Sequence, residues 1–157
     1  MNNKTIGFIG GGRITRIFLE YPGCVLDVDK EEPDLRTPAS SFDRFWVADR
    51  DGAVLACIAC ALKDDVAELK KLYVDRSVRG EGVARELVAL VEQEARGHGA
   101  PQIELWSDTR FETAHAVYLH LGYEQTGRTR DLHDLSHTTE FHFAKEISRG
   151  GAESAGD

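Results

Sequence analysis

A glycine-containing turn lies between a strand-like segment and a helix-like segment of this chain. The turn reads Arg-Gly-Glu-Gly-Val-Ala at residues 79–84 and follows the mostly apolar run 69–74. After the turn, apolar side chains recur every three or four residues from Val83 to Ala95, which is the spacing of an amphipathic helix. The sequence therefore predicts that this turn begins a helix.

A helix that begins at this turn predicts an anion-binding site. The first backbone N–H groups of a helix have no partner inside it, and the helix dipole adds partial positive charge there. Gly80 and Gly82 lack a Cβ atom, so an anion can approach these amides, and Arg79 adds a permanent cation with several donors. We expect the whole turn to bind a phosphorylated cofactor through Arg79, Gly80, Glu81, Gly82, Val83 and Ala84.

The turn has two other interpretations. The glycines alone fit a simple chain reversal with no ligand, because short glycine patterns also occur by chance. A nucleotide P-loop is disfavoured, because no Gly-Lys-Ser/Thr follows the turn.

Length and composition predict one compact domain over residues 1–147, followed by a disordered tail at 148–157 that is small, polar and rich in glycine. The net charge of -8 argues against a nucleic-acid surface. The apolar run 53–62 is too short to span a bilayer and is better explained as a buried strand. No secretory signal is evident, which favours a cytoplasmic protein.

The three cysteines, Cys24, Cys57 and Cys60, form no even disulfide set, which fits a reducing compartment. Cys57 and Cys60 spell a C-x-x-C pattern. Residues three apart in a strand point to opposite faces, so we expect two separate buried thiols rather than a redox or metal motif.

The pattern along the chain predicts an antiparallel meander, then strand, helix, strand, helix and two closing strands. An Asp-Gly pair at 51–52 predicts a hairpin turn. The expected strands cover residues 45–48, 54–62, 67–74, 103–106, 123–129 and 138–144, and the second helix covers 113–121.

The N-terminal segment 1–25 is harder to interpret. Residues 5–12 resemble the opening of a Rossmann dinucleotide-binding site, but Thr15 stands where the third glycine or alanine is required. A first strand followed by a short helix at 14–20 is the favoured interpretation, and a nicotinamide-dependent oxidoreductase is a weaker alternative. Residues 27–43 are acidic and contain Pro33 and Pro38, which predicts a loop with short helices.

Two spaced motifs resemble the GNAT superfamily of N-acetyltransferases, most clearly over residues 45–147. The first is the Arg-x-x-Gly-x-Ala turn after a Leu-Tyr-Val strand; the second is Ala114, Tyr118 and the Leu-Gly-Tyr sequence at 121–123. The resemblance implies an α/β fold with a mixed, mostly antiparallel central sheet flanked by helices. It also implies that acetyl-CoA is the co-substrate and that the turn holds its pyrophosphate. One departure is Phe111, which stands where many members carry a cofactor-contacting Asn.

The resemblance also implies roles for individual residues in acetyl transfer to a primary amine. Glu68 is the candidate general base, although a strand glutamate is often solvated or ion-paired, here with Lys70 or Lys71. Glu104 is a weaker candidate, and the acidic residues at 27 and 29 or a water chain are alternatives. Backbone groups of Leu72, Tyr73 and Val74 are expected to pair with the pantetheine arm and the oxyanion, with a bulge freeing an amide. Tyr118 is expected to protonate the leaving thiolate, unless it is only a core aromatic.

The loop that contains Asp131, His133, Asp134 and His137 has residue types that can bind a metal, but such residues are usually solvated turn formers, and we expect no metal. A non-catalytic acyl-CoA-binding or sensing module remains the main alternative function. The sequence does not identify the acceptor, which is a small-molecule or peptide amine. It predicts no membrane partner and leaves the oligomeric state open, a homodimer included.

Overall fold

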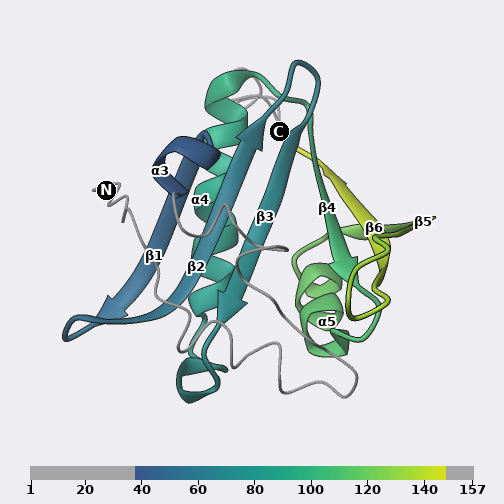
Figure 1. The fold of residues 1–157 in the computed structure, drawn as a ribbon. Coiled ribbons are helices and arrows are strands. Elements are labelled where there is room, and N and C mark those ends of the chain that lie inside the picture. The colour runs from purple at the N-terminus through teal and green to yellow at the C-terminus, as the bar shows by residue number, and fades with distance from the viewer. Residues whose placement is uncertain (1–37, 148–157) are drawn as a thin grey trace.

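The computed structural model describes residues 38–147 (Figure 1). The predictions for the glycine-rich segment 5–12, the short helix 14–20, Cys24, most of the acidic segment 27–43 and the tail 148–157 lie outside this range. Within it, residues 38–41 of the acidic segment form the short helix α3 (Pro38–Ser41).

Six strands form one mixed sheet in the order β1-β2-β3-β4-β6-β5. Only β3 and β4 run parallel among the described strands, so the predicted mostly antiparallel α/β sheet is confirmed. The helix α4 packs on β2, β3 and β4, and α5 lies against β5 toward the β5 edge of the sheet (Figure 1). The elements are β1 (Arg44–Arg50), β2 (Ala53–Leu62), β3 (Ala67–Val74), the 3-10 helix η2 (Arg76–Val78), α4 (Val83–His98), β4 (Gln102–Asp108), α5 (Glu112–His120), β5 (Glu124–Asp131) and β6 (Thr139–Glu146).

The hairpin between β1 and β2 has the turn that its sequence predicts. Asp51 has φ 52° and Gly52 has φ 84°. Positive φ at both central residues characterises the primed turn whose twist matches that of paired strands. The segment 53–62, expected to be a buried strand, forms β2 with these bounds.

The core has two parts, one on each face of the sheet. The larger part lies between the sheet and the two main helices and includes Ile58, Val91 and Ile103. The smaller part lies on the opposite face and consists of Phe45, Cys57 and Ala59. Cys60 belongs to the larger part, so the two thiols of the C-x-x-C pattern are buried on opposite faces, as predicted. Burial raises the pKa of Cys60 to about 12, which makes its thiol a poor nucleophile.

The strands β3 and β4 lie together at their N-terminal ends and separate toward their C-terminal ends (Figure 1). Their register consists of two Cα pairs, Ala67 with Ile103 and Glu68 with Glu104. After these paired residues, β3 contains a bulge. Lys70 pairs with Ala59 of β2 and Tyr73 pairs with Cys57, so two residues of β3 stand opposite one residue of β2. Lys71 lies in this bulge with φ 56°. The structure therefore contains the irregularity that the sequence resemblance led us to expect in this strand.

None of the helices in the described range has the length and hydropathy required to cross a bilayer.

Candidate functional site

The glycine turn forms the N-terminus of α4, as predicted. Gly82 is the N-cap residue with φ 81° and ψ 9°, and Gly80 has φ 83°. Both conformations are left-handed, which residues with a Cβ adopt at a cost. A Cβ atom added at either glycine would meet nothing within 4 Å. No side chain of the described residues caps this end of the 16-residue helix. The first amides of α4 are therefore uncapped by side chains of residues 38–147, and such amides suit an anionic group.

Arg79 fixes the turn to the end of β3. Its Nε atom donates a hydrogen bond to the carbonyl oxygen of Val74 at 3.1 Å, and its backbone N–H donates to Arg76 at 3.3 Å. The carboxylate of Glu81 forms an exposed ion pair with Arg50 at 3.1 Å, so it is directed toward the β1–β2 hairpin. The structure thus brings the turn and the C-terminal end of β3 together.

The backbone of Leu72, Tyr73 and Val74 lies beyond the last Cα pair between β3 and β4. The side chains of Leu72 and Val74 pack on the larger part of the core. Tyr73 packs on the smaller part, on the opposite face. Beyond the pair Glu68–Glu104, β3 and β4 separate, and we call the space between them the wedge. The backbone of residues 72–74 lies along the wedge, and their side chains pack into the core on the two faces of the sheet.

Tyr118 is buried in the larger part of the core. Its ring centroid lies 6.1 Å from that of Tyr123 and 5.7 Å from that of Phe143. Its hydroxyl has no hydrogen-bond partner within residues 38–147, whereas the Tyr123 hydroxyl donates to Glu92 at 3.0 Å. Burial raises the pKa of Tyr118 above its ordinary value of 10.0, so the phenol is protonated at neutral pH. The Tyr118 ring thus packs in the core, while its hydroxyl group donates no hydrogen bond to the described residues.

Glu68 is buried and ion-paired, but its partner is Lys63, at 2.8 Å, and not Lys70 or Lys71. The expectation from sequence proximity was wrong because the β2–β3 connection brings Lys63 over this end of β3, and Lys71 is displaced into the bulge. The hydrogen bond to Glu68 raises the pKa of Lys63 above 10.5.

A chain of polar contacts continues from Lys63 across the sheet. Lys63 lies 3.3 Å from Oε2 of Glu104, whose Oε1 lies 2.9 Å from Nε2 of His142. Nδ1 of His142 lies 2.7 Å from the hydroxyl of Thr126. Burial tends to raise the pKa of Glu104, but the hydrogen bonds from His142 and Lys63 outweigh it and hold that pKa below 4.5. The weaker base candidate, Glu104, is therefore part of the same network as Glu68.

Trp106 is a further residue on this face that sequence reasoning missed. The guanidinium carbons of Arg128 and Arg130 lie 5.1 Å and 4.3 Å from its ring centroid, and the His142 ring lies 4.6 Å away. In β4, the buried Ile103 and Leu105 alternate with the half-buried Glu104 and Trp106. This alternation in the sequence could have predicted that Glu104 and Trp106 share one face of the sheet.

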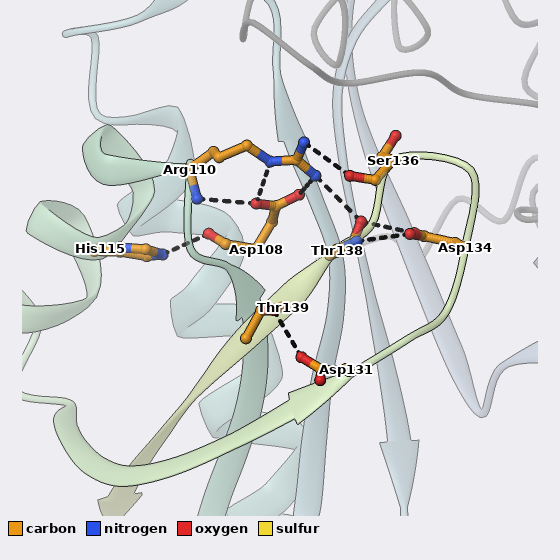
Figure 2. Close-up of polar contacts among 8 residues, drawn as sticks. All are labelled: Asp108, Arg110, His115, Asp131, Asp134, Ser136, Thr138 and Thr139. Atoms are coloured by element: carbon orange, nitrogen blue, oxygen red, sulfur yellow. Dashed lines mark hydrogen bonds and ion pairs between the residues drawn. The ribbon is translucent and has the colours of Figure 1, made fainter.

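Asp108 and Arg110, the polar residues beside Phe111, form a clamp with the loop between β5 and β6 (Figure 2). Nε and one terminal nitrogen of Arg110 contact the two carboxylate oxygens of Asp108 at 2.9 Å and 2.7 Å. Arg110 also donates to the Ser136 carbonyl and to the Thr138 hydroxyl. The carbonyl oxygen of Asp108 lies 2.9 Å from Nε2 of His115 in α5. These side chains fix where α5 begins, and nothing in these contacts shows them replacing the cofactor-binding Asn.

The loop considered for a metal holds its carboxylates against threonines (Figure 2). Asp134 accepts hydrogen bonds from the backbone and hydroxyl of Thr138, and Asp131 accepts one from Thr139. Within residues 38–147 there is no group of three or more His, Cys, Asp or Glu side chains arranged to hold a metal ion.

Residues 12–123 match the acetyltransferase (GNAT) family. The chain belongs to this family. The match includes the glycine turn, both motifs of the resemblance and the wedge between β3 and β4.

Individual members of the GNAT family are similar to this chain over different spans. The N-acetylaspartate synthetase of Danio rerio is 28% identical over 118 residues, covering 74% of this chain and 42% of the synthetase. This chain thus spans less than half the length of that relative.

Solved structures share the fold. A GNAT acetyltransferase from Staphylococcus aureus superposes with a TM-score of 0.74 at 19% identity, covering 87% of this chain and 89% of that one. A streptothricin acetyltransferase from Bacillus anthracis, solved in complex with acetyl coenzyme A, gives a TM-score of 0.58 at 19% identity, covering 66% of this chain and 62% of that one.

Proposed function

We propose that this GNAT protein transfers an acetyl group from acetyl-CoA to a primary amine. The observation that carries the proposal is the open N-terminus of α4, preceded by two left-handed glycines and tied by Arg79 to the end of β3. This arrangement fits a pyrophosphate group, because backbone N–H donors and positive charge converge on one open surface. Membership of the family supports the same assignment.

The proposed cofactor site comprises the residues of the turn and of the wedge. Amides of residues 80–84 and the Arg79 side chain would hold the pyrophosphate. Backbone groups of Leu72, Tyr73 and Val74 would pair with the pantetheine arm, because this stretch lies beyond the β3–β4 pairing. When bound, acetyl-CoA supplies the thioester whose acetyl group is transferred.

The chain's own residues would move the protons of the reaction. Glu68 accepts a proton from the incoming ammonium, which exposes the nitrogen lone pair. A backbone N–H in residues 72–74 donates to the carbonyl oxygen while the C–N bond forms and the C–S bond breaks. The hydroxyl of Tyr118 protonates the departing thiolate, and the second proton lost by nitrogen restores the phenol through solvent. The net products are an amide, a thiol and one proton.

The Lys63–Glu68 ion pair has a consequence for acceptor binding. Lys63 occupies one side of the Glu68 carboxylate at 2.8 Å. The ammonium group of the acceptor would also bind a carboxylate oxygen of Glu68. It would therefore approach the carboxylate from the side away from Lys63, or it would displace the Lys63 ammonium. The exposed position of Lys63, whose side chain is 49% accessible, permits such displacement.

The test is a thiol-release assay with acetyl-CoA over a library of amines, together with calorimetric titration of CoA. We expect Arg79→Gln to weaken CoA binding about tenfold and Arg79→Glu to weaken it further, because charged hydrogen bonds to phosphate are lost. Arg44→Glu, at the far edge strand, serves as the charge-reversal control. Unchanged CoA affinity in a folded Arg79→Glu protein would refute the proposed cofactor site.

The same assay separates an enzyme from a binding module. CoA binding without thiol release across the whole library would favour the acyl-CoA-binding or sensing module. We also propose that residues 1–147 form one acetyltransferase domain, because the family match covers 12–123 and the last strand ends at Glu146. A cytoplasmic location is proposed as well, since Cys57 and Cys60 are buried free thiols.

A further inference from the structure

We propose that Arg128, stacked on Trp106, binds a carboxylate of the acceptor, so that the acceptor is an amino acid rather than a simple amine. This inference rests on the proposed acetyltransferase function and names its substrate class. The relevant face of the sheet is the one opposite α4, where Glu68, Glu104 and His142 also lie.

The backbone of β5 places Arg128 on this face. Gln125 pairs with Phe143 and Thr129 pairs with Phe141, so residues 126–128 stand opposite a single residue of β6. Gly127 has φ 87° within this bulge. Thr126 contacts His142, and Arg128 and Arg130 both contact the Trp106 ring. Thr126, Arg128 and Arg130 alternate along this exposed strand and contact residues of one face of the sheet, and the bulge lies between the first two.

Arg128 differs from Arg130 in its pairing. Arg130 donates from Nε to Glu140 at 2.7 Å, which neutralises it locally. The guanidinium of Arg128 has no hydrogen bond or ion pair within the described part of the chain, and its recorded contact is the Trp106 ring at 5.1 Å. A guanidinium oriented by an indole, with its forked donors unused, is suited to bind a carboxylate in two-point contact.

The other charged side chains around this position contact one another. The carboxylates of Glu68 and Glu104 are both in contact with Lys63, and Glu104 also contacts His142. Glu140 is paired with Arg130. Each of these carboxylates is thus in contact with Lys63 or Arg130, whereas the guanidinium of Arg128 contacts no carboxylate within the described residues.

The distance along the sheet fits a small amino acid. Trp106 is two residues beyond Glu104 on the same face of β4, about 7 Å along the strand. Glu104 is the Cα partner of Glu68 at the point where β3 and β4 separate. An acceptor whose carboxylate contacts Arg128 would therefore place its amine toward Glu68 and the wedge that holds the thioester.

Binding can be tested without turnover by tryptophan fluorescence. The chain contains two tryptophans, and Trp46 is only 4% exposed in the core. We expect titration with glutamate or alanine, in the presence of CoA, to change the emission, and titration with ethylamine to leave it unchanged. Trp106→Phe should abolish the response. A response that persists in Trp106→Phe, or that is absent for every amino acid tested, would overturn the proposal.

Kinetics with matched acceptors provides the second test. Alanine and ethylamine, or glutamate and 4-aminobutyrate, differ by one carboxylate on the same skeleton. We expect kcat/KM to be at least about tenfold higher for the member with the additional carboxylate, and Arg128→Gln to remove this preference by raising KM. Arg128→Lys should keep part of it, and Arg44→Glu should leave it intact.

The outcomes distinguish failure of the carboxylate subsite from failure of the acetyltransferase function. Equal loss of activity toward both members of each pair in Arg128→Gln would overturn the carboxylate subsite while leaving the acetyltransferase proposal in place. Absence of CoA binding in the wild-type protein would instead refute the proposed function. If no acceptor of the panel is acetylated, the fluorescence titration still decides whether Arg128 and Trp106 bind a carboxylate.

Discussion

Glu68 and Glu104 are Cα partners at the last paired position of β3 and β4, and Lys63 lies within 3.3 Å of both carboxylates. Two like charges side by side would repel each other, so the shared ammonium ion keeps this end of the wedge together. The arrangement places the candidate base at the closed end of the wedge, immediately before the strands separate to leave backbone groups of β3 unpaired with β4.

Acidification should destabilise the protein partly through Glu104. Its folded-state pKa lies below 4.5, so its contribution to stability is present above that pH and is lost as the pH falls through the folded-state value. We expect Glu104→Gln to be less stable than wild type at pH 7 but to lose less stability between pH 6 and pH 3. Thermal unfolding across this range measures the difference. Parallel pH curves for the two proteins would contradict this account.

The glycine turn should tolerate alanine poorly because of backbone conformation. Gly82→Ala introduces no steric contact, but φ 81° costs about 1 kcal/mol for a residue with a Cβ. We expect this loss in the free energy of unfolding together with weaker CoA binding. Gly97→Ala is the matched control, because Gly97 lies inside α4 without positive φ, and it should stabilise the protein by about 0.5–1 kcal/mol. Equal effects of the two substitutions on stability would argue against strain at residue 82.

Removal of the hydroxyl group should lower turnover at Tyr118 and lower stability at Tyr123. Tyr118→Phe removes a hydroxyl that has no partner within residues 38–147, so the free energy of unfolding should change by less than about 0.5 kcal/mol while kcat at pH 7 falls. Tyr123→Phe removes the hydrogen bond to Glu92 and should cost about 1 kcal/mol with little effect on kcat. Chemical denaturation and steady-state kinetics on both variants test this. Unchanged turnover in Tyr118→Phe would remove this residue from the proposed mechanism.

The clamp beside α5 should contribute strongly to stability (Figure 2). The Asp108 side chain is only 8% exposed, so Arg110→Gln leaves a buried carboxylate without its ion-pair partner and should cost about 2–3 kcal/mol. Arg44→Gln breaks the more exposed pair with Glu94 and should cost less than about 1 kcal/mol. Hydrogen exchange should also show weaker protection of the first turn of α5 in Arg110→Gln. A loss no larger than that of Arg44→Gln would show that the clamp is not a stabilising pair.

Local patterns in the sequence were sufficient for the main strands and helices and for the conformation of the glycine turn. The apolar run 53–62 became β2 with those bounds, and the Asp-Gly pair formed the expected hairpin turn. The turn at 79–84 begins α4 with both glycines in left-handed conformation. Such features depend on side-chain periodicity and on the backbone preferences of neighbouring residues. A short stretch of sequence is therefore enough to predict them.

The acceptor side depended on tertiary structure. Sequence proximity assigned Lys70 or Lys71 to Glu68, whereas the hairpin geometry and the bulge at Lys71 made Lys63 its partner. Trp106 and Arg128 meet because the strand order places β6 alone between β4 and β5 and because the two side chains lie on the same face. Strand order and register decide which distant residues share a face, and one displaced residue reverses the direction of a side chain. The sequence alone predicted a glycine turn at the start of a helix, because neighbouring residues determine it, whereas the strand order and register decided which distant charged side chains lie together.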